Sequence, residues 1–170
     1  MLPTATKIAV LYNPPNSTHL AILQNLLSKS SGAGVEVIPS TLKPHDELDA
    51  LFSRLTTERM DAVQLLPDPA VSETLRDRLA ALALAQKLPL FSNSETATDT
   101  GALLSYGGPI YKMLSRMGYY LRRILDGADA GDLPVEQPTE VILVVNLKTA
   151  KARGVEVPAA LLARADRMIE

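Results

Sequence analysis

The sequence of 170 residues contains no cysteine, no tryptophan and only two histidines, His19 and His45. The absence of cysteine excludes a disulfide framework, a thiol nucleophile and a zinc–thiolate site. The two histidines stand far apart, each near the start of a predicted helix, so we expect surface or capping residues. No nucleophile–base pair and no metal-ligand spacing can be named. We therefore expect a protein that is not an enzyme and that uses no cofactor and no metal.

Long apolar runs and clustered positive charge are also missing. No uninterrupted apolar run approaches the length of a membrane-spanning helix, and the first residues lack the pattern of a signal peptide. The net charge is −2 and the lysines and arginines are scattered, so we expect no nucleic-acid partner. Aromatic residues make up only 4% of the chain. Tyr106, Tyr111, Tyr119 and Tyr120 nevertheless all fall within the stretch 101–158, which marks it as unusual.

The rest of the sequence is a regular alternation of short apolar runs and longer amphipathic segments. Runs that are continuously apolar are typical of strands buried on both faces of a parallel sheet. Glycines at 32 and 34 follow a helix rather than a strand, so they indicate a helix end and not a phosphate-binding turn. The predicted strands are 7–11, 35–38, 61–66, 88–91 and 102–105, and the predicted helices are about 17–30, 44–59, 69–86 and 110–126.

Strands separated by helices of this length predict an α/β fold, in which a mainly parallel sheet is flanked by helices in a three-layer, flavodoxin-like sandwich. Each helix carries a leucine-rich stripe that we expect to face the sheet. In the first helix that stripe consists of Leu20, Leu23, Leu26 and Leu27. We expect Tyr119 and Tyr120 to be packing residues of the helix at 110–126.

Ligands of such sheets bind beyond the carboxyl ends of the strands. The loops expected there are 12–17, 67–72, 92–95 and 106–111, all rich in polar residues, glycine and proline. Asp68 and Glu95 could receive an ammonium group, and Tyr12 and Tyr106 could stack on an apolar or aromatic ligand. The backbone at 107–109 could bind a carboxylate at the start of a helix. Asp68 could equally cap the following helix, and Glu95 could be a solvated charge.

Several motifs resemble the ABC-transporter substrate-binding protein family of the tryptophan/tyrosine type. They are GALLSYGGPIYKM, Leu-Pro-Val-Glu-Gln-Pro-Thr, Val-Asn-Leu-Lys-Thr-Ala-Lys and the terminal Ala-Asp-x-x-Ile-Glu, with KIAVLYNPPN and LLPDPAV upstream. The resemblance covers nearly the whole chain and implies one lobe of the type I periplasmic-binding-protein fold. It implies these ligand-binding residues: Asn13, Ser17, Asp68, Ser72, Ser92, Glu95, Tyr106 and Gly107. Among them Asp68 is the expected ammonium contact.

Family members have two lobes, so the chain corresponds to the C-terminal half. We expect a Rossmann-like lobe at 1–108, a helix at 109–133 that normally packs on the N-terminal lobe, and a crossing strand with C-terminal helices at 134–170. Gly108 and Pro109 stand where members often carry Pro followed by Asp or Asn, which removes one polar contact. The apolar face of the helix at 109–127 needs cover. We therefore expect a homodimer in which this helix packs against a partner or is swapped.

The resemblance implies the solute-binding component of an ABC-type importer. Its ligand would be a small molecule, such as an aromatic or apolar amino acid, and its partner would be an ABC permease. Its place would be periplasmic, or extracellular and lipid-anchored. A ligand-sensing regulatory domain of the same fold is the alternative. Because a lone lobe supplies about half of an interlobe site, we expect weak or undetectable ligand binding by this chain alone.

Overall fold

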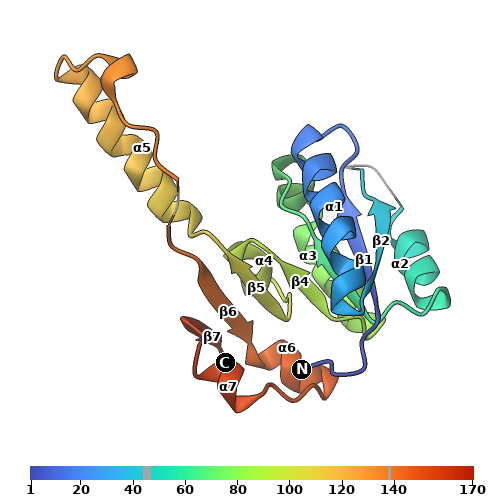
Figure 1. Ribbon diagram of the computed structural model, residues 1–170. Coiled ribbons are helices and arrows are strands. Elements are labelled where there is room, and N and C mark those ends of the chain that lie inside the picture. The colour runs from blue at the N-terminus through green and yellow to red at the C-terminus, as the bar shows by residue number, and fades with distance from the viewer. Residues whose placement is uncertain (44–46, 138) are drawn as a thin grey trace.

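A computed structural model describes residues 1–43, 47–137 and 139–170, without the side chains of residues 31 and 70–73. One seven-stranded sheet has the order β2-β1-β3-β4-β5-β6-β7. The first five strands are parallel, β6 is antiparallel to β5, and β7 is parallel to β6. Helices cover this sheet, so the predicted α/β fold with a mainly parallel sheet is confirmed (Figure 1).

The elements follow one another as the sequence pattern predicts, with the short helix α4 and the short C-terminal strand β7 in addition to the predicted ranges. The strands are β1 Lys7–Tyr12, β2 Glu36–Thr41, β3 Ala62–Leu65, β4 Leu90–Ser92, β5 Leu104–Gly107, β6 Ile142–Asn146 and β7 Arg167–Ile169. The α-helices are α1 Ser17–Ser30, α2 Leu48–Thr57, α3 Pro69–Ala85, α4 Glu95–Asp99, α5 Ile110–Leu125, α6 Leu147–Arg153 and α7 Ala159–Leu162.

The alternation of side chains along the strands divides the core between the two faces of the sheet. Ala9 and Leu11 of β1 belong to the larger cluster, which α2 and α3 cover with residues such as Phe52 and Leu79. Val10 points the other way and packs with Leu23 of α1. Both sides of β1 are therefore buried, which explains why its sequence is continuously apolar.

Several sequence expectations need correction. The inner stripe of α1 is wrong in part, since Leu20 and Leu27 are exposed while Leu23 and His19 are buried. The strand predicted at 102–105 runs instead from Leu104 to Gly107. The predicted helix at 44–59 begins at Leu48, and residues 44–46 lie outside the described residues. The glycine pattern after α1 is confirmed as a helix end, because Gly34 adopts a left-handed φ of 68°.

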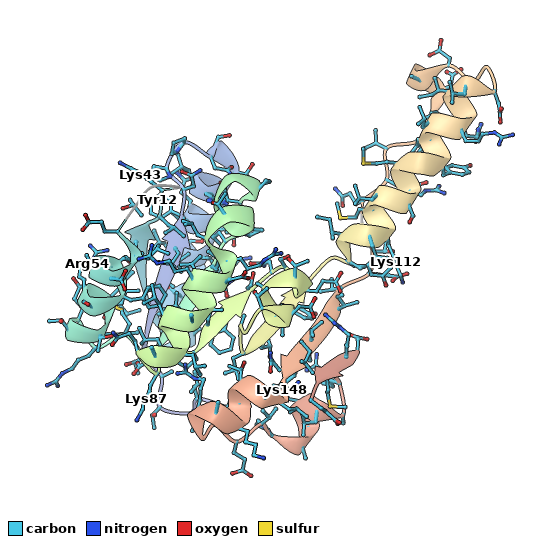
Figure 2. The ribbon with its side chains drawn as sticks, turned by 180° about the vertical axis from the view of Figure 1, so that it is seen from behind. Tyr12, Lys43, Arg54, Lys87, Lys112 and Lys148 are labelled. Atoms are coloured by element: carbon cyan, nitrogen blue, oxygen red, sulfur yellow. The ribbon has the colours of Figure 1, made fainter. Side chains whose placement is uncertain are left out.

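α5 and the chain that follows it leave the body of the protein as an arm (Figure 1). Lys112 lies near the base of this arm, and the side chains beyond it surround the helix rather than enter the core (Figure 2). Within the described part of the chain, none of the 16 residues of α5 is buried. Tyr119 and Tyr120 are therefore not buried against the body of the described chain, and their expected role as packing residues of this helix stays a prediction.

Polar contacts, rather than buried apolar residues, hold α5 and the returning chain together. Arg116 forms an ion pair with Glu136 of the returning chain, and its guanidinium carbon lies 4.0 Å from the ring centre of Tyr119. The Tyr120 hydroxyl donates a hydrogen bond of 2.8 Å to the carbonyl of Pro134. The Arg116 guanidinium holds the pKa of Glu136 below its usual value. These contacts fasten segment 133–137 along one side of α5 and leave another side uncovered.

Asp61, directly before β3, closes the opposite end of the sheet. Its Oδ2 accepts the backbone N–H groups of Thr6 at 2.8 Å and Lys7 at 2.9 Å, which lowers the pKa of the carboxyl group. Its pKa is therefore lower in the folded than in the unfolded chain. The associated stability is present above the unfolded value and is lost as the pH falls through the folded value.

We expect Asp61→Asn to lower the free energy of unfolding by about 1 kcal/mol at pH 7, because two charge-assisted hydrogen bonds weaken at a partly exposed site. At a second, acidic pH below the lowered pKa of Asp61, most of this difference should disappear, since the native carboxyl group is then protonated too. Urea denaturation at both pH values measures it. An equal difference at both would show that the charge of Asp61 is not the cause.

Candidate functional site

The carboxyl ends of the five parallel strands meet at the edge of the sheet from which α5 departs. An open hollow of about 410 Å³ lies there. Strand-end residues form one side of it, and α5 with the returning chain forms the other. The lining residues are Pro67, Asn93, Ser94, Gly107 and Gly108 from the strand ends, and Ile110, Met113, Glu140 and Val141 from the arm.

Asp68 is the centre of a polar cluster at this edge. Its residue is only 4% exposed, and its Oδ2 accepts hydrogen bonds of 3.0 Å from the Nδ2 atoms of both Asn13 and Asn16. The cluster joins the loop after β1 to the loop after β3. The parallel-strand rule brought Asn13 and Asp68 together in the prediction, whereas Asn16 was missed. Its position three residues after Asn13 in the same loop was the available signal.

The side-chain oxygen of Asn13 is less well satisfied than its amide group. Asn13 Oδ1 is buried and has no hydrogen-bond partner among the residues that the structure describes. A buried acceptor without a partner costs on the order of 1–3 kcal/mol. The loop after β1 therefore contains one polar group that the described chain does not compensate.

His19 is a buried residue next to the cluster, contrary to the expectation of a surface or capping residue. The residue is only 1% exposed. Its Nδ1 accepts the backbone N–H of Asn13 at 2.9 Å, which leaves the ring proton on Nε2. Nε2–H then donates to the carbonyl of Pro67 at 3.0 Å. The imidazole thus links the loop after β1 to the residue before Asp68 and is a structural residue.

The loop after β4 is rigidified by its own serines. Ser92 is buried, and its Oγ accepts the backbone N–H of Ser94 at 3.1 Å. Asn93 Oδ1 accepts a hydrogen bond of 2.9 Å from Gln64 Nε2. Ser92 therefore shapes the turn, while Asn93 and Ser94 line the hollow. Sequence reasoning chose the first residue of this loop and missed the next two.

Gly107 has a structural role in addition to the predicted ligand-binding role, since it lines the hollow. It belongs to β5, where it pairs with Ile142 of β6, so only Gly108 and Pro109 separate the strand from α5. A Cβ atom at position 107 would lie 1.9 Å from the carbonyl oxygen of Asn93. Glycine is needed here because the loop after β4 passes directly against the backbone of β5.

Glu95 pairs with a cation of β7 and does not take part in the hydrogen bonds of the Asp68 cluster. It stands in the first turn of α4, with its carboxylate 3.9 Å from Arg167 of β7. Arg167 also contacts Asp99 at 2.8 Å, and these two carboxylates raise the pKa of its guanidinium. The structure thus gives Glu95 a cation within the chain, which corrects its interpretation as a solvated charge and weakens its assignment to a ligand ammonium.

The remaining predicted positions differ in exposure. Tyr106 of β5 is 53% exposed and could still meet a ligand. Tyr12 instead packs against the α1 side of the core. Ser17 is exposed as the first residue of α1. Ser72 lies within α3, and its side chain is outside the described residues.

Neither a metal site nor a membrane-spanning helix is found in the described part of the chain. In residues 1–43, 47–137 and 139–170, no group of three or more His, Cys, Asp or Glu side chains could hold a metal ion. Over the same ranges, no helix has both the length and the apolar character to cross a membrane.

Known proteins share both the sequence pattern and this fold. The family model described as ABC transporter substrate binding protein matches residues 1–169. A curated relative named tyrosine-binding protein, from Clostridioides difficile (strain R20291), is 24% identical over 152 residues, which are 89% of this chain and 44% of the relative. The chain therefore spans about half the length of the curated relative that it matches.

Two solved structures superpose closely on the chain. A conserved domain protein from Vibrio cholerae is 26% identical with a TM-score of 0.87, and the match covers 98% of this chain and 56% of that one. An ABC domain in complex with L-Trp, from Streptococcus pneumonia, has the same TM-score and coverage at 20% identity, which shows a shared fold. On the family match over 169 residues, the chain belongs to the ABC transporter substrate-binding protein family.

Proposed function

We propose that the chain provides one wall of the solute site of an ABC-type importer and that its ligand is a small amino acid-like molecule. The observation that carries the proposal is the buried Asp68 carboxylate, held by Asn13 and Asn16 beside an open hollow at the strand ends. A carboxylate at such an edge is suited to a ligand ammonium group. The names of two relatives, one tyrosine-binding and one in complex with L-Trp, favour an aromatic amino acid.

The chemistry of the hollow agrees with an amphipathic ligand of this kind. Ile110 and Met113 offer apolar surface, and the backbone and side chain of Asn93 and Ser94 offer polar groups. Asp68 and the unpartnered Asn13 oxygen would receive the ammonium group. Tyr106 lies exposed on the adjacent strand and could stack on an aromatic ring.

Transport would follow from binding without any chemical step. In this proposal a second lobe, as in relatives about twice as long, closes over the ligand, and the closed form engages an ABC permease. The protein would work in the periplasm or outside the cell, attached through a lipid. Affinity in such sites comes from enclosure on all sides. One wall alone would therefore bind an amino acid weakly.

Isothermal titration of the chain with L-tryptophan and L-tyrosine tests the weak binding. We expect a dissociation constant above about 0.1 mM, so that little heat is observed at ordinary protein concentrations. Tight, stoichiometric binding to the chain would contradict the one-wall account. L-arabinose, which lacks an ammonium group, is the matched negative control.

A further inference from the structure

The two walls of the hollow at the strand ends present their carboxylates differently. On the strand-end wall Asp68 is only 4% exposed, and it already accepts hydrogen bonds from two amide groups. On the arm wall stands Glu140, and no other described residue that lines the hollow carries a charge. Glu140 is thus the carboxylate that a ligand in the hollow can reach without entering the Asp68 cluster.

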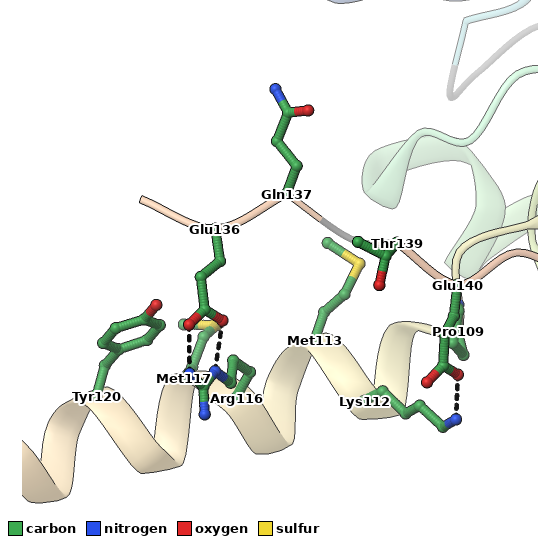
Figure 3. A pocket seen from close by; sticks show the side chains of 10 residues that line it. All are labelled: Pro109, Lys112, Met113, Arg116, Met117, Tyr120, Glu136, Gln137, Thr139 and Glu140. Atoms are coloured by element: carbon green, nitrogen blue, oxygen red, sulfur yellow. Dashed lines mark hydrogen bonds and ion pairs between the residues drawn. The ribbon is translucent and has the colours of Figure 1, made fainter. Parts of the chain in front are cut away.

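Glu140 already binds a cation that belongs to the chain itself. Its carboxylate forms an ion pair with Lys112 in the first turn of α5, at the base of the arm (Figure 3). Both side chains are about half exposed, at 49% for Lys112 and 58% for Glu140. Exposed ion pairs contribute little to stability, because water competes for both charges. Another cation can therefore replace Lys112 on this carboxylate at a small cost.

The ion pair stands between the hollow and a second cavity. Glu140 lines both the hollow and a groove of about 370 Å³ between α5 and the returning chain (Figure 3). Lys112 lines the groove but is not among the described residues that line the hollow. Lys112 thus holds Glu140 from the groove side, and a cation in the hollow would approach the carboxylate from the other side.

The ion pair is independent of what covers the apolar side of α5. Leu114, Met117 and Leu121 are the exposed apolar residues on that side. Lys112 lies two residues before Leu114, which places it about 200° around the helix axis from Leu114. A second lobe packed on the apolar side would therefore leave the ion pair in place.

We propose that Glu140 is a specificity residue of the ligand site, which releases Lys112 and binds the ammonium group of a ligand in the hollow. The exchange replaces one cation by another on the same carboxylate, and the released Lys112 is exposed enough to be hydrated. A ligand without an amine gains nothing from Glu140. The site would therefore select amines over uncharged or anionic molecules of the same shape. The inference rests on the proposed function, because it adds a contact from the arm to that of Asp68.

Two substitutions that break the same ion pair separate ligand contact from structural support. The amide shifts of Asn93 and Gly108, measured while the ¹⁵N-labelled chain is titrated with L-tryptophan up to its solubility limit, give the dissociation constant. We expect Glu140→Gln to raise this constant about fivefold, and Lys112→Met to lower it about twofold to threefold because no exchange is then needed. A shift of the constant in the same direction in both variants would indicate a purely structural ion pair and overturn the proposal.

The neighbouring ion pair of Arg116 and Glu136 controls for long-range effects of charge. It lies one turn further along α5 and lines the groove, but neither residue is among those described as lining the hollow. Arg116→Met and Glu136→Gln should therefore leave the dissociation constant within about twofold of the wild-type value. Effects as large as those at Lys112 and Glu140 would show that only the net charge of the arm matters, which also contradicts the proposal.

Indole-3-propionate tests the selection of the amine, because it keeps the ring and the carboxylate of tryptophan but lacks the ammonium group. Any shifts that it causes should be the same in Glu140→Gln and in the wild type. Tryptophan shifts that vanish in Asp68→Asn but are unchanged in Glu140→Gln would overturn the role of Glu140 and leave the proposed function standing. A lack of shifts at Asn93 and Gly108 in Lys112→Met would do the same, since one wall alone binds weakly in the proposed function.

Discussion

Asp68→Ala is expected to lower the free energy of unfolding by about 2–4 kcal/mol, because the substitution leaves two amide groups without their acceptor at a largely buried site. Asn13 already has one unsatisfied oxygen. The substitution would also remove the hydrogen bond that the Asn13 amide group donates to the loop after β3. Urea denaturation followed by circular dichroism, at one fixed protein concentration, measures the loss.

Asp77→Ala is the matched control for this prediction. Asp77 is an exposed aspartate on the same helix that Asp68 precedes, and its replacement should change stability by less than about 0.5 kcal/mol. Asn16→Ala, combined with Asp68→Ala in a double-mutant cycle, should give a coupling energy of about 1 kcal/mol or more. Equal effects of Asp68→Ala and Asp77→Ala would show that the cluster does not hold the two loops together.

Gly107→Ala is expected to destabilise the fold by roughly 3 kcal/mol, because the new methyl group collides with backbone rather than with a side chain that could rotate away. The carbonyl group of Asn93 would have to move, and with it the loop that lines the hollow. Thermal unfolding of the variant, at the concentration used for the wild type, measures the effect.

Gly32→Ala provides the comparison, since an added Cβ at position 32 meets nothing within 4 Å and needs no unusual backbone angle. This variant should unfold within a few degrees of the wild type. If Gly107→Ala were as stable as Gly32→Ala, the close approach of the β4 loop to β5 would be absent in solution, and the described shape of the hollow would be wrong.

The repeating elements were predictable because each repeats a local rule. Apolar runs indicated β1 and β3, and the stripe of Leu48, Leu51, Phe52 and Leu55 indicated α2, all four of them buried. The helical connections between the strands correctly predicted that β1 to β5 are parallel. The strand β7 was missed, since its three residues Arg167–Ile169 carry no periodic pattern of their own.

Within the candidate site, only contacts between residues that follow neighbouring parallel strands could be predicted. Asn13 and Asp68 meet because their strands, β1 and β3, are parallel neighbours. The ion pair of Glu95 was not predicted because its partner Arg167 comes from the unpredicted β7, 72 residues further along the chain. The burial of His19 was not predicted because its two hydrogen-bond partners are backbone groups, and the residue types in the sequence do not indicate such partners.

For the exposed helix α5, the sequence pattern predicts the helix itself but not the surface against which it packs. Its amphipathic spacing correctly predicts a helix at Ile110–Leu125, yet none of its residues is buried by the described chain. Amphipathicity states that a helix needs a partner without saying where that partner lies. Tyr119 and Tyr120 accordingly contact Arg116 and the returning segment instead of a core.

The most direct test of the proposed ligand site is a titration of the ¹⁵N-labelled chain with L-tryptophan at millimolar concentrations, followed by amide chemical shifts. A site at the strand ends predicts fast-exchange shifts that gather at Asn13, Asn93 and Gly108 and that vanish in Asp68→Asn. Shifts that gather instead in the groove lined by Met113, Met117 and Tyr120, or strand-end shifts that persist unchanged in Asp68→Asn, would contradict a ligand site at the strand ends.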